Sequence, residues 1–299
     1  MSAPHAISRA RSLALIGGAA ALGSCSSSHG NAIAIGSKDF TEELILGEMY
    51  AQILENFGMP VVRKLDLGGT QVAMEALLRG DIDLYPEYTG TALITELKLR
   101  PQKDAAANYE TVKREYETRY HLTWLRPAPF NDTQALATTQ TVRQKYHVTT
   151  LSDLAKAAPH LRLGAIPEFT KREDGLPGLQ KAYGGFQFKD IKLFDIGLKY
   201  QALMSGQVDV VVAFGTDGQI EVDQLYVFAD DKHFWPSYQA APVVRDATLQ
   251  AHPTIAPRLN KLAPLLDDAT MRGLNAQVDG EKLDPADVAR AFLREHSLA

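Results

Sequence analysis

Two cationic residues, Lys38 and Arg172, occupy similar places in two similar parts of the chain. Each follows a short apolar stretch that we predict to be a strand, and each comes shortly before the next predicted helix. Free backbone N–H groups and the positive end of a helix dipole favour an anion at such a place, and a nearby cation strengthens the preference. Either residue alone could simply be a mobile surface cation. Because their positions match, a shared site that holds a carboxylate is as reasonable an interpretation as two surface cations.

Three aromatic residues, Tyr88, Phe214 and Tyr238, offer a second kind of binding chemistry. Aromatic faces attract a quaternary ammonium group, which neither donates nor accepts hydrogen bonds. Each ring taken singly could be part of a core. Tyr88, however, follows Pro86 and precedes Thr-Gly-Thr, which predicts a position outside the strand, where core packing is less expected. An ammonium head and a carboxylate tail together describe a betaine.

Catalytic chemistry has little support in this sequence. The Gly-x-Ser-x-Gly elbow, the phosphate-binding Gly-rich loops and the His-Glu-x-x-His motif are all absent. The histidines are scattered, and none pairs with another at the spacing of helical metal ligands. Asp81 with Asp83, and Asp230 with Asp231, could bind a metal, but carboxylates at strand ends are more often solvated or capping. We therefore predict a binding protein and no enzyme, with no metal and no cofactor.

The candidate residues lie on a structural unit that occurs twice. In both copies a helix ends at a glycine, an apolar strand follows, and an aromatic residue stands eight positions after the glycine, in residues 76–91 and 202–214. The opening strands, residues 33–36 and 161–164, also match. Tyr88 and Phe214 are thus equivalent positions, and we expect them to face each other across a cleft.

The order of predicted elements in each copy is strand, helix, strand, helix, strand. This order is typical of an α/β fold whose loops gather at one edge of a parallel sheet. Asp39 with Glu42 predicts a capping box for the first helix, Gly80 predicts the end of the second, and Ser152 predicts a cap in the other copy. The predicted strands are residues 32–36, 61–67, 82–85, 161–164, 188–195 and 208–213.

Bulk composition is that of an ordinary globular protein with ample core material. The chain has 299 residues, 45% of them hydrophobic and 22% charged, and its formal charge is −5. That charge, without any dense basic run, excludes a typical nucleic-acid binder. The single cysteine excludes an internal disulfide.

The N-terminus has the form of an export signal. Arg9 and Arg11 precede an apolar run at residues 13–22, and Leu22-Gly23-Ser24-Cys25 resembles a lipobox, the cleavage and acylation signal of bacterial lipoproteins. We predict a signal peptide at residues 1–24, lipidation at Cys25 and a flexible tether at residues 25–31. The alternative is a plain secretory signal with a chance cysteine. The expected location is the periplasm or the outer face of a membrane.

Five blocks, in this order along the chain, resemble one known family. They are Gly36-Ser37-Lys38-Asp39-Phe40-Thr41-Glu42, Pro86-Glu87-Tyr88-Thr89-Gly90-Thr91, residues 170–179, Asp195-Ile196-Gly197-Leu198-Lys199-Tyr200 and Ala240-Ala241-Pro242-Val243-Val244. The resemblance is to the quaternary-amine substrate-binding proteins of ABC importers, the ProX/OpuC/OsmF group. It covers the mature chain from about residue 32 onward.

The resemblance implies a two-lobed periplasmic-binding-protein fold of type II, with a mostly parallel, helix-flanked sheet in each lobe and the ligand in the cleft between them. It implies residues 32–132 plus 240–299 as lobe 1 and 133–239 as lobe 2. It also implies closure on glycine betaine, choline, carnitine or a related osmolyte, and delivery to a permease driven by an ATPase. We expect a monomer.

Carried over by motif, the carboxylate clamp is Lys38, Thr91 and Arg172, and all three are present. A clamp of this kind favours a zwitterion over choline. In the aromatic cage, Tyr88 and Tyr238 match the family.

Two cage positions depart from the family pattern. Gln134 and Phe214 stand where the family has tyrosines. Losing one cation–π contact, worth roughly 0.5–2 kcal/mol, predicts weaker betaine binding, or a ligand with a polar group for Gln134, such as carnitine or an ergothioneine-like betaine. Asp132 adds an acceptor near the cation. A rival hypothesis keeps the fold in a sensor or interaction lipoprotein without transport.

Overall fold

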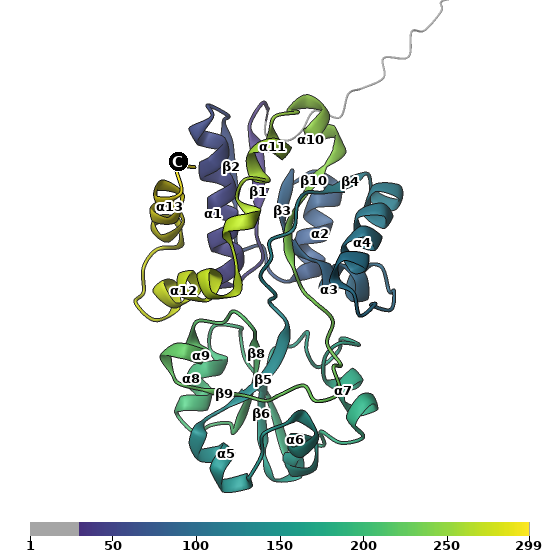
Figure 1. Cartoon of the computed structure of the whole chain (residues 1–299), viewed down its shortest axis with the longest axis vertical. Coiled ribbons are helices and arrows are strands. Elements are labelled where there is room, and N and C mark those ends of the chain that lie inside the picture. Colours follow the sequence, from purple (N-terminus) through teal and green to yellow (C-terminus); the bar gives the residue numbers. More distant parts are fainter. Residues whose placement is uncertain (1–29, 299) are drawn as a thin grey trace, which may run out of the picture.

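The computed structural model describes residues 30–298 and has two lobes, one above the other in Figure 1. In the described part of the chain each lobe is built on a five-stranded sheet, with strand orders β2-β1-β3-β10-β4 and β7-β6-β8-β5-β9. The strands of the first lobe are β1 (Ile33–Gly36), β2 (Val61–Lys64), β3 (Leu84–Tyr88), β4 (Leu122–Trp124) and β10 (Ala240–Arg245). Those of the second are β5 (Gln134–Thr138), β6 (Arg162–Ala165), β7 (Asp190–Leu193), β8 (Val210–Phe214) and β9 (Tyr226–Val227).

The two sheets have the same internal plan. In the first, β2, β1 and β3 run parallel, and β10 is antiparallel to both β3 and β4. In the second, β7, β6 and β8 run parallel, and β5 is antiparallel to both β8 and β9. The reversed strand in each sheet is the one that the chain enters on crossing from the other lobe. The predicted mostly parallel α/β lobes are confirmed.

Helices cover both faces of each sheet (Figure 1). The first lobe carries α1 (Thr41–Asn56), α2 (Thr70–Arg79), α3 (Thr89–Thr91), a π-helical turn η1 (Ala92–Glu96), α4 (Ala105–Tyr120), α10 (Asp246–Ala251), α11 (Ile255–Leu259), η3 (Ala263–Leu265), α12 (Asp268–Asp279) and α13 (Pro285–Glu295). The second carries α5 (Gln140–Tyr146), α6 (Leu151–Ala157), η2 (Ala158–His160), α7 (Leu176–Tyr183), α8 (Lys199–Met204) and α9 (Gln219–Val222).

Each sheet has an apolar cluster on both faces. On one face of the first sheet, Ile45 and Met49 of α1 meet Leu274 of α12 and Phe292 of α13. On its other face, Leu77 of α2 packs with residues of α4 and β4. The C-terminal helices therefore complete the core of the first lobe, although the chain has visited the second lobe in between.

The third strand is longer than its sequence suggests. β3 extends to Tyr88, so the prediction that Tyr88 lies outside the strand is wrong. Pro86 lies within β3 and faces Pro242 of β10. Because neither proline has an N–H group, no buried donor is left unpaired at that position, and the strand continues through it.

Helix caps were predicted with mixed success. Gly80 ends α2 in the left-handed conformation, at φ 77°, as predicted. The predicted capping box of Asp39 and Glu42 is wrong, because the N-cap residue is Phe40 and Glu42 is buried inside the protein. The cap predicted at Ser152 is also wrong. Thr150 caps α6 and forms a capping box with Asp153.

The predicted signal peptide, most of the tether and Cys25 lie outside the described residues. Over residues 30–298, no helix combines the length and the apolar character needed to cross a membrane. The residues at which the chain passes between lobes, predicted after 132 and after 239, stay a prediction.

Candidate functional site

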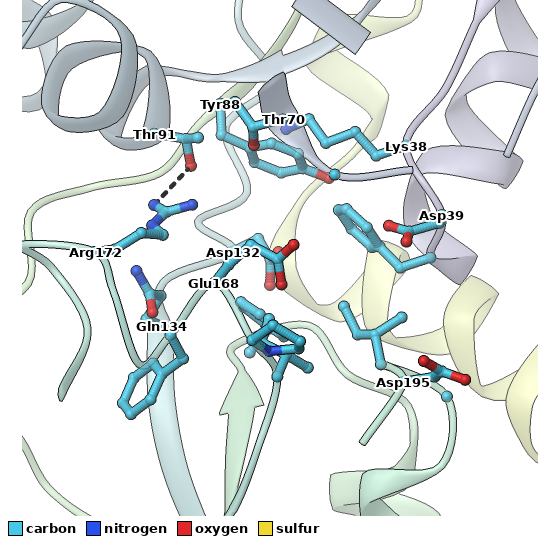
Figure 2. A pocket seen from close by; sticks show the side chains of 18 of the residues that line it. Lys38, Asp39, Thr70, Tyr88, Thr91, Asp132, Gln134, Glu168, Arg172 and Asp195 are labelled. Carbon is cyan, nitrogen blue, oxygen red and sulfur yellow. Dashed lines mark hydrogen bonds between the residues drawn. The ribbon is translucent and has the colours of Figure 1, made fainter. Parts of the chain in front are cut away.

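A cavity of about 430 Å³ lies where the carboxyl ends of β1, β3, β6 and β8 from the two lobes meet. Its volume is in the range of small-molecule sites. Every residue that we predicted for ligand contact lines it: Lys38, Tyr88, Thr91, Asp132, Gln134, Arg172, Phe214 and Tyr238. Figure 2 shows Thr91, Arg172 and Gln134 on one side of the cavity and Lys38, Asp39 and Asp195 on the other.

Tyr88 and Phe214 end equivalent strands, and Phe40 contacts both rings. The Phe40 ring centroid lies 6.1 Å from that of Tyr88, tilted by 33°, and 6.4 Å from that of Phe214, at an interplanar angle of 12°. The two strand-end aromatics were expected to face each other directly. Instead, a third ring from the loop before α1 joins them, which adds an aromatic wall.

Two lysine ammonium groups of the protein lie over these rings. Lys38 Nζ is 4.7 Å from the centroid of Tyr88, and Lys199 Nζ is 5.0 Å from that of Phe214. Both lysines are buried. A cation that entered the cavity would share each ring with an internal cation, which limits what either ring could contribute alone.

The ammonium group of Lys38 already has acidic partners. Its Nζ is 2.7 Å from Glu87 Oε1 and 3.7 Å from Glu43 Oε1, and both glutamates are fully buried. Burial raises the pKa of Glu43 to about 8, against the opposing effect of Lys38. Much of the positive charge that Lys38 brings to the cavity is therefore already balanced by these buried glutamates.

Arg172 is oriented by a buried carboxylate, Asp174. Arg172 Nε donates to Asp174 Oδ1 at 2.7 Å, and Nη2 donates to Oδ2 at 2.5 Å. Asp174 Oδ2 also accepts from Gln134 Nε2 at 2.7 Å and from the Tyr238 hydroxyl at 2.6 Å. One carboxylate therefore fixes three of the predicted ligand residues in a single arrangement.

Thr91 joins Arg172 across the cleft. Arg172 Nη2 lies 3.4 Å from Thr91 Oγ1, drawn as the dashed line in Figure 2. Thr91 belongs to α3 of the first lobe, and Arg172 lies in the loop before α7 of the second lobe. The guanidinium and the hydroxyl are therefore brought together only when the lobes are close.

Asp132 forms part of a buried acidic cluster. Its Oδ1 accepts from the backbone N–H of Thr216 at 3.3 Å and lies 2.7 Å from Thr216 Oγ1. Thr216 Oγ1 is also 2.5 Å from Glu42 Oε2. Burial raises the pKa of Asp132 well above its ordinary value and that of Glu42 to about 7.

Four more carboxylates line the cavity: Asp39, Asp66, Glu168 and Asp195. Burial, helped by the neighbouring charges of Glu168 and Asp66, raises the pKa of Asp39. The lining therefore has more acidic than basic side chains, which favours a ligand with a positive group. No group of three or more residues with metal-ligand side chains occurs in the described part of the chain.

Sequence reasoning missed several residues of the site. Phe40 and Phe169 both line the cavity, and the Phe-Thr pair that each begins occurs after the first strand of both copies. That repeat could have identified them. Asp174, Glu42 and Thr216 gave no such signal, because their importance comes from contacts between distant parts of the chain.

Known proteins resemble this chain in sequence and in fold. The model of the family described as the substrate binding domain of the ABC-type glycine betaine transport system matches residues 31–295. The chain belongs to this family. It is 40% identical over 275 residues to the glycine-betaine-binding protein of Pseudomonas aeruginosa, covering 88% of each chain.

Two further family matches agree. The chain is 39% identical over 267 residues to the ergothioneine transport permease/ergothioneine binding protein EgtU of Helicobacter pylori, covering 89% of this chain and 48% of EgtU. It thus spans about half the length of that relative. The crystal structure of a glycine betaine/carnitine/choline ABC transporter superposes with a TM-score of 0.72 at 32% identity, covering 89% of this chain and 99% of the other. The predicted family and type II binding-protein fold are confirmed.

Proposed function

We propose that this chain captures a quaternary-ammonium zwitterion outside the cytoplasm by closing its lobes, and delivers it to an ABC permease with its ATPase. The supporting observation is the interlobe cavity, which combines aromatic rings and acidic side chains with an arginine. The rings of Tyr88, Phe40, Phe214 and Tyr238 with Asp132 suit the ammonium head. Arg172 and Thr91 suit the carboxylate.

Within this proposal, Lys38 has a smaller share in the clamp than Arg172, because its ammonium group already pairs with Glu87. Arg172 also has an acidic partner, but its planar fork carries five N–H donors, and Asp174 uses only two of its nitrogen atoms. Gln134 acts mainly by holding Asp174, and Asp132 supplies negative charge beside the head group. The protein binds its ligand without converting it, and Cys25 carries the lipid anchor.

A second candidate is a larger betaine, such as carnitine or an ergothioneine-like compound. A neighbouring hollow of about 520 Å³ shares Gly69, Thr70, Pro167, Glu168 and Arg172 with the main cavity. A ligand with its head group among the rings could extend past Arg172 into this hollow. The resemblance to EgtU, whose name includes ergothioneine, supports the same candidate.

Isothermal calorimetry with glycine betaine, choline, carnitine and ergothioneine tests both candidates. We expect tighter binding of a zwitterion than of choline, since choline has no carboxylate for Arg172. Tighter binding of carnitine or ergothioneine than of glycine betaine would favour the second candidate. If none of the four binds, the proposed ligand class is wrong, and the sensor or interaction lipoprotein becomes the better hypothesis.

A further inference from the structure

We propose that Glu42 and Asp132 share one proton through the hydroxyl of Thr216, and that a cationic head group in the cavity draws this proton to Glu42. Glu42 is then a positioning residue that leaves Asp132 ionised for the ligand. The inference rests on the proposed function only for the presence of a cation in the cavity. The shared proton itself belongs to the protein.

The geometry requires a proton between the two acids. Thr216 Oγ1 lies 2.5 Å from Glu42 Oε2 and 2.7 Å from Asp132 Oδ1. A hydroxyl carries one hydrogen atom, so it can donate to only one of the two carboxyl groups. The other contact is a hydrogen bond only if that carboxyl group is protonated and donates to the hydroxyl oxygen. Otherwise two carboxylate oxygens would face one hydrogen.

No cation neutralises the pair within the described residues. The groups that face Glu42 are the Tyr88 hydroxyl from β3 at 2.7 Å, the Asn275 amide from α12 at 3.0 Å and Thr216. The charge of a third acid, Asp217, raises the pKa values of both Glu42 and Asp132.

The other charged side chains around Glu42 and Asp132 already pair with groups outside this pair. Lys199 pairs with Asp217 at 3.3 Å, and Lys38 pairs with Glu87 and Glu43. Asp279 of α12 accepts from Thr41. Two buried carboxyl groups without a counter-ion hold a proton more readily than two full charges, and burial accordingly raises the pKa of each.

The two acids are not equivalent with respect to the cavity. Asp132 lines it, whereas Glu42 lies behind it, next to the hydroxyl of Tyr88. A positive head group therefore interacts more strongly with a charge on Asp132 than with one on Glu42. The cation shifts the shared proton away from itself.

The transfer needs no water and no outside donor. The proton on Asp132 Oδ1 passes to Thr216 Oγ1 while the hydrogen of that hydroxyl passes to Glu42 Oε2. Afterwards protonated Glu42 donates to Thr216, and Thr216 donates to ionised Asp132. The number of protons is unchanged. Because Glu42 belongs to α1 of the first lobe and Thr216 follows β8 of the second, the hydrogen-bonded chain also links the lobes.

Substituting each acid by its isosteric amide distinguishes the role of Glu42 from that of Asp132. Glu42→Gln keeps a permanent donor toward Thr216 and removes the need for transfer, so we expect it to bind a quaternary ammonium ligand about tenfold more tightly, the ratio for one pKa unit. Asp132→Asn removes the charge beside the head group, and we expect binding weaker by about tenfold or more. Calorimetry at pH 7 with choline and glycine betaine measures both.

Two controls make the result specific. Thr216→Val removes the hydroxyl at nearly constant shape, so adding Glu42→Gln to Thr216→Val should give no further gain. Glu48→Gln makes the same change on α1 at a buried acid that contacts Gln52 and Arg63, away from the cavity. It should leave the dissociation constant unchanged.

A ligand-free measurement keeps the inference separate from the proposed function. Infrared spectroscopy of the unliganded protein at neutral pH should show a protonated-carboxyl band that changes in Asp132→Asn. Adding ligand should shift the band, and the shift should be lost in Glu42→Gln. If the wild type binds none of the ligands, the proposed function fails, while the unliganded band still tests the proton. If ligands bind but the two amide variants change affinity in the same direction, or no such band appears, the shared proton is wrong.

Discussion

Individual side chains at this site carry out two tasks. Some face the ligand space, and others hold those residues in place. Asp174 is buried and makes hydrogen bonds to Arg172, Gln134 and Tyr238. The Gln134 side chain is therefore already engaged by the protein as a donor to Asp174. Substituting it should change how the other side chains of the site are held.

Arg172→Ala separates zwitterionic from purely cationic ligands. Losing a hydrogen bond to a charged group costs about 1.5–3 kcal/mol, so glycine betaine should bind roughly 10- to 150-fold more weakly. Choline lacks a carboxylate and should lose much less. Calorimetry of both ligands, with Lys171→Ala in the same loop as the matched control, measures the difference. Equal losses for both ligands would contradict an arginine clamp.

The sequence predicted the composition of the site better than its internal contacts. Lys38 and Arg172 were found from their places after equivalent strands, and both line the cavity. Their partners Glu87 and Asp174 were not foreseen as such. Residue spacing shows which side chains reach a sheet edge. It does not show which acid each cation meets there, because that depends on how the loops fold.

At the scale of single elements, the short helix α3 matters because one of its residues, Gly90, has no side chain. Gly90 lies directly against the ring of Tyr238, and an added Cβ would be 2.6 Å from the ring atoms. The φ angle is not the constraint at this position. The constraint is close packing between α3 and the segment that returns to β10, which together set the wall that Tyr238 presents.

Gly90→Ala should therefore weaken binding through Tyr238. The ring must move, and its hydroxyl then leaves Asp174, so we expect a loss of about 1–3 kcal/mol in unfolding free energy together with reduced ligand affinity. Gly273→Ala on α12 is the matched control, since no atom lies within 4 Å of its added Cβ. That change should be neutral or stabilising by up to about 1 kcal/mol. Urea unfolding and calorimetry measure both variants, and equal behaviour would contradict the packing argument.

The order of elements followed from the sequence, whereas their ends did so only partly. Apolar runs and Gly80 located strands and helices, because burial and a left-handed glycine are local signals. The end of β3 was missed because Pro86 usually ends a strand. Its tolerance depends on Pro242, more than 150 residues later, lying directly opposite. A pairing between distant strands cannot be deduced from either segment alone.

The whole molecule repeats one plan in two lobes, and each lobe receives its reversed strand from the other. Contacts across the cleft come from both lobes: Arg172 meets Thr91, Glu42 meets Thr216, and Arg272 of α12 donates to the Gly215 carbonyl at 3.1 Å. One of these contacts involves a group that gains or loses a proton, the Glu42 carboxyl, whereas the two arginines stay protonated. The stability of the closed form should therefore depend on pH.

Buried Glu43 gives stability a pH dependence of definite sign. Burial raises its pKa from 4.5 to about 8, so the folded protein holds a proton that the unfolded chain releases above pH 4.5. The contribution of Glu43 to stability is complete below that pH and is lost as pH rises through about 8. Each pKa unit corresponds to about 1.4 kcal/mol.

Glu43→Gln should reduce this decline, because an amide cannot ionise and imitates the protonated acid. We expect the unfolding free energy of the wild type, measured with urea between pH 5 and pH 9, to fall more steeply with pH than that of Glu43→Gln. The difference should grow to the order of a few kcal/mol at the alkaline end. Glu48→Gln on the same helix removes a carboxylate that pairs with Arg63, so its curve should be displaced from the wild type by a constant amount. Parallel curves for the wild type and Glu43→Gln would mean that Glu43 is ionised in the folded protein, with Lys38 as its counter-ion in place of a proton.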